Sequence, residues 1–264
     1  MHFYTGDATY DTVLACAFAY AFFAAVGSLF VIAPYGRFAS ERFGVSLDPR
    51  LGWLLMEVPA PLTFLYFFLR GPHHDAWAPR VFLLVWLVHY ANRAFYFPLS
   101  IRAPRGSRAS FSFMVVAAGW LATSLHGYLN GAYVSTWGAH LTDAWLTDPR
   151  FLVGLAVYYA SFAVNLYSDA ILRNLRTREE VDAGKKVYRI PYGGLFRYVT
   201  CPSYLSELTG WLGFALAMWS LSGVFIFVLS AANLVPRAAA THRWYRERFP
   251  DYPPERRALI PFVW

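Results

Sequence analysis

The chain has 264 residues, of which 57% are hydrophobic and 15% charged, and its formal net charge is +7. A soluble domain is usually about 45–50% apolar and about 25% charged, so this composition argues against a water-soluble globule, a disordered chain and a fibrous repeat. An integral membrane protein is the class that the composition predicts. Two cysteines, Cys16 and Cys201, are too few for a disulfide framework or a cysteine-rich metal site.

Apolar stretches predict the membrane-spanning helices, because about 20 apolar residues are needed to cross a bilayer. In chain order they cover residues 12–34, 51–69, 81–101, 111–133, 151–172 and 208–236. The last stretch is too long for one helix and contains a turn signal at residues 219–223, so we divide it into two helices. We therefore expect an all-α membrane protein with seven transmembrane helices, forming one membrane-embedded domain over residues 1–264.

Basic residues fall mainly at one end of these helices. If the N-terminus lies outside, Arg70, Arg80 and Arg150 are also outside and Arg93 lies within a span. The positive-inside rule then predicts a cytoplasmic C-terminus, and it explains the net charge without a nucleic-acid partner. The other basic residues would be cytoplasmic: Arg37, Arg42, Arg50, Arg102, Arg105, Arg108, Arg173, Arg176, Arg178, Lys185, Lys186, Arg189, Arg197, Arg237, Arg243, Arg246, Arg248, Arg256 and Arg257.

Ionisable side chains inside predicted spans are candidates for function, because each costs about 2.5–3.5 kcal/mol at the bilayer centre. Glu57 lies on the second span, and His89 and Arg93 lie on the third. Asp169 and Glu207 border the polar segment 173–200. Two structural alternatives remain open: a buried Glu57–Arg93 ion pair between helices, and solvation of Asp169 and Glu207 at the membrane surface.

Histidines and known ligand motifs give no metal or nucleotide signature. The sequence lacks GxGxxG, GxxxxGK[ST] and HExxH, and we expect no metal site. His126 is alone on its span, which is more typical of a hydrogen-bonded core residue than of a ligand. His89 would either orient the neighbouring Tyr90 or fill a packing gap.

Several segments resemble the steroid 5α-reductase family, the 3-oxo-5α-steroid 4-dehydrogenases. The resemblance follows the family's order over almost the whole chain and implies a seven-helix membrane reductase. Such an enzyme uses NADPH to saturate the carbon–carbon double bond of an α,β-unsaturated ketone, typically a 3-oxo-Δ4-steroid. The segments are LLMEVPAP at 54–61, HYANRAFYFPL at 89–99, NLYSDAILRNLR at 165–176, YRIPYGGLFRYVTCPSYLSEL at 188–208 and WYRERFPDYPPERRALIPFVW at 244–264.

The resemblance also implies which residues form the site. The family's catalytic pair, a Glu in the second span and a Tyr in the third, matches Glu57 and Tyr90. Ser203 and Ser206 stand where the family usually has Asn and Gly, and either Thr241 or His242 would contact the cofactor. The matching cofactor residues are Tyr35, Gly36, Arg93, Asn165, Asp169, Arg173, Arg176, Tyr188, Arg189, Ser203, Glu207, Trp211, Arg237, His242 and Tyr245.

Enone reduction suits these side chains. Negative charge develops on the ketone oxygen, and hydrogen-bond donors aimed at that oxygen lower the barrier. Tyr90 can donate its phenolic proton, whereas Glu57 can donate only when protonated, a state that burial favours and Arg93 opposes. Arginines of segment 173–197 and Arg237 suit the phosphates of NADPH, and the carboxylates of Asp169 and Glu207 suit its ribose hydroxyls or carboxamide.

The expected organisation places the substrate mainly among the first four helices. The cofactor would lie among the last three, the cytoplasmic loops and the C-terminal tail. The expected partners are a flat apolar enone and the lipid bilayer, and we expect a monomer that binds no nucleic acid. The 21 arginines against 2 lysines hint at a GC-rich bacterial genome, hence an inner membrane, with the endoplasmic reticulum as the eukaryotic counterpart.

Three other functions remain open. Arg197, Pro202, Tyr204 and Glu207 echo a C-terminal pattern of membrane isoprenylcysteine methyltransferases, which bind S-adenosylmethionine. A reductase of enoyl-CoA or polyprenal substrates is a second alternative, and a non-catalytic sterol-binding membrane protein is a third. The small molecule that copurifies with the protein would discriminate a reductase from a methyltransferase and from a scaffold.

Overall fold

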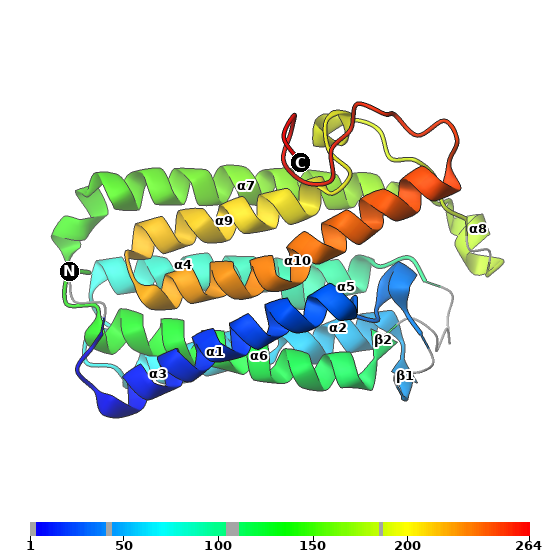
Figure 1. Cartoon of the computed structure of the whole chain (residues 1–264). Coiled ribbons are helices and arrows are strands. Elements are labelled where there is room, and N and C mark those ends of the chain that lie inside the picture. Colours follow the sequence, from blue (N-terminus) through cyan, green and yellow to red (C-terminus); the bar gives the residue numbers. More distant parts are fainter. Residues whose placement is uncertain (1–3, 41–43, 104–110, 185–186) are drawn as a thin grey trace.

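The computed structural model describes residues 4–40, 44–103, 111–184 and 187–264. Long helices run side by side and alternate in direction along the chain (Figure 1). One short antiparallel pair joins β1 (Ser46–Leu47) to β2 (Phe111–Ser112), with Leu47 opposite Phe111. The helices are α1 (Ala8–Phe30), α2 (Pro49–Glu57), α3 (Pro59–Arg70), α4 (Trp77–Tyr90), α5 (Phe97–Ser100), α6 (Phe113–Ala132), α7 (Pro149–Asn174), α8 (Arg178–Asp182), α9 (Pro202–Met218) and α10 (Leu221–Arg248).

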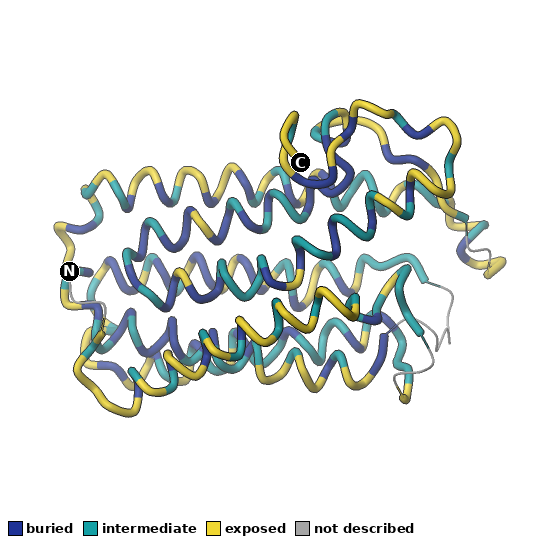
Figure 2. The backbone as a smooth tube through the Cα atoms, in the orientation of Figure 1, coloured by how far each residue is buried: buried dark blue, intermediate teal, exposed yellow. Residues whose placement is uncertain are grey.

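Four helical segments among the described residues are long and apolar enough to cross a membrane: Ala8–Phe30, Pro49–Arg70, Pro149–Asn174 and Leu221–Arg248. Exposed apolar side chains also support a membrane protein. On α1, the side chains of Phe22, Phe23, Leu29 and Phe30 are between 63% and 82% exposed. Figure 2 shows such exposed positions along the outer sides of α1 and α7. These features fit an all-α membrane protein, while the number of seven spans and their orientation stay predictions.

The predicted third, fourth and sixth spans are helical but shorter or interrupted. The third consists of α4, a π-helical turn over Ala91–Tyr96, and α5. The fourth is α6, with 20 residues, and the sixth is α9, with 17. The expected turn before the last helix is confirmed: Trp219 adopts a left-handed conformation (φ 51°), and the Ser220 side chain caps α10 by accepting from Gly223 N.

Two local irregularities bend the helices around the polar residues. Val58 separates α2 from α3, where Pro59 begins the new helix and cannot donate a backbone hydrogen bond. The π-helical turn Ala91–Tyr96 inserts extra backbone into the third helical rod directly after Tyr90. Such turns occur often at functional sites, because they rotate the following side chains relative to the preceding ones.

The closest helix pair is α7 with α9. Gly154 and Gly213 face each other across it: a Cβ on Gly154 would lie 2.6 Å from Gly213 O, and a Cβ on Gly213 would lie 2.7 Å from Gly154 O. Only glycine fits at both positions, so the two backbones meet directly, as is common between membrane helices.

The helix ends that carry most of the described arginines lie at one end of the bundle. The last turns of α7 and α10, α5, α8 and the C-terminal tail gather at one end, and the start of α7 lies at the other (Figure 1). Arg173 and Arg246 therefore lie at the end opposite to Arg70 and Arg150. Arg42, Arg105, Arg108 and the two lysines, predicted at the same end as Arg173, lie outside the described residues.

Candidate active site

A cavity of about 270 Å³ lies near the arginine-rich end, between α2, the π-helical turn, α5, α7 and α9. Eight of the residues predicted to bind a cofactor line it: Tyr35, Arg93, Asn165, Asp169, Arg173, Arg176, Ser203 and Glu207. Its other lining residues are Trp53, Phe97, Ser100, Ile101, Arg102, Leu172, Tyr204 and Leu234. Cationic, acidic and aromatic side chains from distant parts of the sequence thus share one space.

Helix α7 supplies the polar wall through residues spaced by one helical turn. Asn165, Asp169, Arg173 and Arg176 follow each other at intervals of three or four residues, so their side chains share one face. Asn165 Nδ2 donates to Ser203 O at 2.9 Å, and Ser203 Oγ donates to Asp169 Oδ1 at 2.7 Å. These bonds tie α7 to the first turn of α9 and fix the Asp169 carboxylate at the cavity.

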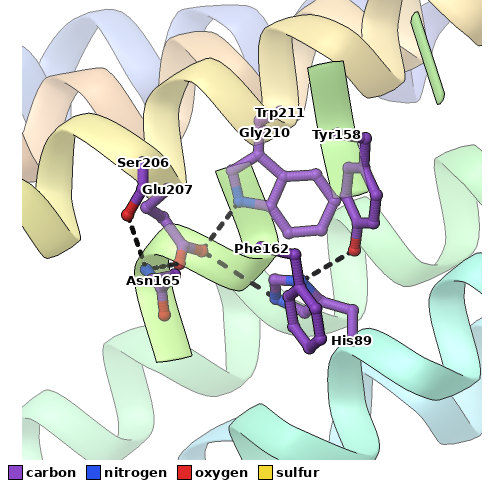
Figure 3. A pocket seen from close by; sticks show the side chains of 8 residues that line it. All are labelled: His89, Tyr158, Phe162, Asn165, Ser206, Glu207, Gly210 and Trp211. Carbon is purple, nitrogen blue, oxygen red and sulfur yellow. Dashed lines mark hydrogen bonds and ion pairs between the residues drawn. The ribbon is translucent and has the colours of Figure 1, made fainter. Parts of the chain in front are cut away.

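Glu207 and Asn165 line both this cavity and a smaller pocket, and Figure 3 shows the smaller one. The small pocket, of about 10 Å³, is roughly the space of one water. Glu207 Oε1 accepts from Trp211 Nε1 at 2.9 Å and lies 3.8 Å from His89 Nε2. On its other side, His89 Nδ1 lies 3.0 Å from the Tyr158 hydroxyl. Trp211, predicted as a cofactor residue, therefore lines the small pocket and holds Glu207.

Glu57 and Arg93 form the ion pair that the sequence left as an alternative. Arg93 Nε lies 3.2 Å from Glu57 Oε1, and Glu57 is 7% exposed. The Arg93 guanidinium also lies over the Trp53 ring, 4.5 Å from its centroid. The pair joins the end of α2 to the π-helical turn, and it places the Glu57 carboxylate next to a residue that lines the cavity.

The Tyr90 hydroxyl meets His126 of α6. Tyr90 Oη lies 3.3 Å from His126 Nε2, and both residues are buried. His126 Nδ1 is buried and has no hydrogen-bond partner among the described residues. His126 is therefore a hydrogen-bonded core residue, as its position on the span predicted. His89 contacts Tyr90 through their rings, in a T-shaped arrangement with centroids 5.0 Å apart.

Arg237 supports the cavity wall from behind. Its Nε donates to Tyr204 Oη at 3.0 Å, its Nη1 to Ala33 O at 2.8 Å and its Nη2 to Tyr35 O at 2.9 Å. The guanidinium stacks on the Tyr35 ring at 3.6 Å. Gly36 follows with a positive φ of 60°, and its conformation lets the chain turn beside Arg237.

Four further predicted cofactor residues do not line this cavity. Arg189 is ion-paired with Glu180, and Tyr188 packs on Trp244 of α10. His242 Nδ1 lies 2.6 Å from Thr200 Oγ1, and the Tyr245 hydroxyl accepts from Arg37. Tyr188, His242 and Tyr245 form an aromatic cluster with Trp244 and Tyr252 between the α10 end and the loop before α9, and Arg189 is not part of it. Thr241, the alternative to His242, is buried.

Arg102 and Trp53 are among the lining residues that the sequence did not single out as site residues. Arg102 and Arg176 bind each other's backbones, with Arg102 Nη1 2.8 Å from Arg176 O and Arg176 Nη2 3.0 Å from Arg102 O. Trp53 holds Arg93 by stacking. Arg102 could have been found from the sequence, because it is a basic residue directly after the third predicted span. Trp53 could not, because its span contains many aromatic residues and nothing distinguishes this one.

The residues that echo the methyltransferase pattern are divided between two cavities. Tyr204 and Glu207 line the cavity of about 270 Å³, Arg197 lines a separate cavity beside the C-terminal tail, and Pro202 lines neither. The structure therefore does not bring the pattern together around one ligand space.

Comparison with known proteins identifies the family. The family model described as 3-oxo-5-alpha-steroid 4-dehydrogenase matches residues 109–264. The chain is 38% identical to 3-oxo-5-alpha-steroid 4-dehydrogenase 1 of Rattus norvegicus over 245 residues, covering 92% of this chain and 91% of that protein. It is 40% identical to the Mus musculus protein of the same name, covering 92% of each chain. It is also 35% identical to steroid 5-alpha-reductase DET2 of Solanum lycopersicum, covering 89% of each chain.

These matches cover most of the chain and of its relatives, and they confirm the resemblance of the sequence segments. The aligned region includes the helices that form the cavity. The chain is therefore an oxidoreductase that belongs to the 3-oxo-5-alpha-steroid 4-dehydrogenase, or steroid 5α-reductase, family.

Proposed function

We propose that this protein uses NADPH to reduce the Δ4 double bond of a 3-oxo-steroid or a similar α,β-unsaturated ketone. The observation that carries the proposal is the match to proteins named for this activity over about nine-tenths of the chain. A cavity that combines arginines and carboxylates, and whose lining residue Arg93 is ion-paired with the buried Glu57, supports it.

The cavity residues fit a dinucleotide phosphate. Arg93, Arg102, Arg173 and Arg176 offer planar guanidinium groups, which bind phosphate oxygens in pairs. The carboxylates of Asp169 and Glu207 can accept hydrogen bonds from ribose hydroxyls or a carboxamide. Ligand sites usually measure about 300–1,000 Å³, so a cavity of about 270 Å³ suits one half of the dinucleotide. The other half would extend over the arginine-rich end.

When bound, NADPH would supply the hydride that adds to the β-carbon of the enone. Tyr90 would donate its hydroxyl proton in a hydrogen bond to the ketone oxygen, where charge develops. The Tyr90 hydroxyl has one proton, so when it donates to the ketone it cannot also donate to His126. In the 3.3 Å contact, His126 Nε2–H would then be the donor and Tyr90 Oη the acceptor. His126 would thus be neutral with a bare Nδ1, in agreement with the absence of any acceptor for Nδ1 among the described residues.

In this proposal Glu57 has two roles: it holds Arg93 when it is ionised, and it polarises the ketone when it is protonated. Its carboxylate accepts from Arg93 Nε at 3.2 Å, and a carboxylate cannot donate to a ketone. Glu57 would polarise the ketone oxygen only after it takes up a proton, and until then it holds Arg93 at the cavity wall. Burial of an unpaired Arg93 would be costly, which gives the pair a structural role as well.

The direct test is product analysis with the purified full-length protein in lipid nanodiscs. We expect a 3-oxo-Δ4-steroid to gain two hydrogens with NADPH, and NADPH deuterated at the transferred position to leave deuterium on the β-carbon. The Tyr90→Phe variant is the matched control. Transfer of a labelled methyl group from S-adenosylmethionine, or reduction of polyprenals or enoyl-CoA with no steroid product, would contradict the proposal.

A further inference from the structure

A second cavity, of about 470 Å³, lies between residues 192–198 and the C-terminal tail. It shares no lining residue with the active-site cavity. Its lining glycines approach Tyr167 and Ile171 of α7, which face away from the cavity-lining Asn165 and Asp169 on the same helix. The lining residues are Tyr192, Gly193, Gly194, Arg197, Tyr198, Pro253, Glu255 and Arg256.

Arg256 gives this cavity an unsatisfied buried cation. The residue is 3% exposed, and its Nε and Nη1 are buried without a hydrogen-bond partner among the described residues. The guanidinium lies over the rings of Tyr192 and Tyr252, at 4.9 and 5.3 Å from their centroids. Ring faces stabilise the charge but do not accept the N–H groups in the guanidinium plane. The Arg256 side chain also hydrogen-bonds Tyr252, but no carboxylate of the described residues pairs with it. Because buried charges are normally paired, this uncompensated charge in the cavity wall favours an anionic ligand.

The other charged side chains in the wall set the charge of that ligand. Arg197 adds a second guanidinium and Glu255 one carboxylate, both exposed. The lining therefore carries a net charge of one positive, which matches a monoanion such as a phosphodiester better than a doubly charged phosphomonoester. Gly194 lets the loop lie close to α7, since a Cβ there would be 2.7 Å from the Tyr167 ring.

An apolar surface adjoins the cavity. Phe262 and Val263 of the tail are 77% and 73% exposed, and Tyr198 of the cavity wall contacts the Phe262 ring with centroids 5.3 Å apart. Tyr167 on the outer face of α7 is 57% exposed. Aromatic side chains at helix ends are typical of the boundary between lipid and water. A ligand with both an anionic group and an apolar part would contact all of these residues.

We propose that this cavity binds the phosphodiester headgroup of an anionic phospholipid at the membrane surface, with Arg256 and Arg197 as the donors. Basic pockets at the ends of membrane helices bind such headgroups. Inorganic phosphate offers the same oxyanion without the apolar part, so the two sources can be separated experimentally.

The test measures binding of short-chain phosphatidylglycerol to the full-length protein in detergent by native mass spectrometry and thermal shift. NADPH is kept saturating, so that the arginines of the active-site cavity are occupied. Phosphatidylcholine carries the same phosphodiester together with a choline cation, so it is neutral overall. We expect phosphatidylglycerol, with its net charge of −1, to bind more tightly than phosphatidylcholine at a wall of net positive charge. Arg197→Gln and Arg256→Gln should each weaken binding about tenfold or more, the loss expected for a charge-assisted hydrogen bond. Arg257→Gln makes the same charge change at a neighbouring exposed residue and should have no effect.

Each outcome decides one part of the proposal. Equal binding of phosphatidylcholine, or equal loss in the Arg257→Gln variant, would overturn recognition of the headgroup by this cavity. Inorganic phosphate that competes as strongly as the lipid would overturn the lipid as ligand. A loss of NADPH affinity in Arg256→Gln as large as the loss of lipid would assign the cavity to the cofactor. Because Arg197 is exposed, its variant keeps the test decisive if Arg256→Gln fails to fold.

Discussion

Tyr90 of α4 and His126 of α6 meet at 3.3 Å between the hydroxyl oxygen and Nε2, in the interior of the bundle. The His126 ring also packs against Trp86, with centroids 5.4 Å apart, and its backbone carbonyl accepts from Asn130 Nδ2 at 2.8 Å. The ring is therefore held in place on several sides. A histidine fixed in this way can determine the direction in which the tyrosine donates its proton.

The Tyr90→Phe substitution removes the proposed donor and little else. We expect kcat for a 3-oxo-Δ4-steroid to fall by about 10²–10³, the usual loss when one oxyanion donor is removed. Steady-state kinetics measures this, and an unchanged thermal unfolding midpoint shows that the fold is intact. Turnover close to that of the wild type would remove Tyr90 from the mechanism.

His126→Phe tests whether the histidine acts through Tyr90. The substitution keeps a ring against Trp86, so we expect kcat to fall by less than in Tyr90→Phe. In a double-mutant cycle, the His126 effect should largely disappear in the Tyr90→Phe background, because residues that share one interaction are not additive. Additive losses would mean that His126 acts independently, through packing or through direct contact with substrate.

Glu57→Gln should destabilise the protein as well as slow it. The change leaves the half-buried Arg93 guanidinium without its carboxylate. Breaking a fully buried pair on one side costs about 3–5 kcal/mol, so we expect a loss below that range. Chemical unfolding in detergent measures the loss, and Glu57→Gln/Arg93→Gln should recover part of it. Glu180→Gln is the matched control, because the Glu180–Arg189 pair is more exposed and such pairs contribute about 0–1 kcal/mol. Equal losses in both variants would contradict burial as the cause.

Arg176→Ala should distinguish NADPH from NADH. Arg176 lines the cavity at its arginine-rich end, where a phosphate is the expected partner. Removal of a charge-assisted bond should raise the KM for NADPH about tenfold or more, with a much smaller change for NADH. Arg178→Ala, at an exposed residue of α8, is the control. A wild-type enzyme that uses both cofactors equally well would refute this specificity.

Asp148 at the start of α7 should make stability depend on pH in the acid range. Its side chain accepts from Arg150 N, and the Arg150 guanidinium lowers the pKa of Asp148 from 3.8 to about 2. A carboxyl with a lowered pKa stabilises the fold above its unfolded-state pKa, and this stabilisation is lost as pH falls from about 4 to about 2. Asp148→Asn keeps a capping side chain but removes the charge. Its unfolding midpoint should lie below that of the wild type at neutral pH and converge with it in acid; a gap that persists would point to another cause.

The positions of the helices in the chain were largely predictable, because each long apolar stretch of the sequence forms a helical segment. The turn at Trp219 and Ser220 followed from the excess length of the last stretch. The π-helical turn Ala91–Tyr96 was not predicted, because an extra residue within a helix leaves no break in an apolar pattern. Nor was the pairing of β1 with β2, because each strand has only two residues, one serine and one apolar residue, and so shows no strand pattern.

The sequence predicted which residues belong to the site better than it predicted their contacts. Charges in apolar spans pointed to Glu57 and Arg93, and their ion pair follows from the cost of leaving either charge alone. The partnership of Tyr90 with His126 could not be read from spacing, because the rotation of one helix relative to another is set by packing over the whole bundle. Arg189 was grouped with the other arginines of its segment, yet Glu180 and the α8 capping box hold it outside the cavity.

The backbone contact of Gly154 with Gly213 has a consequence for how the cavity can open. Helices whose backbones meet directly pack closely, and the bonds from Asn165 to Ser203 and from Ser203 to Asp169 join the same two helices at the cavity, so this wall is the more firmly held one. Entry of a large ligand then requires displacement of the opposite wall, where Tyr35, Trp53 and Phe97 are held to each other by ring contacts. The turnover rate would therefore depend on how quickly these aromatic rings separate to admit the ligand and return to contact.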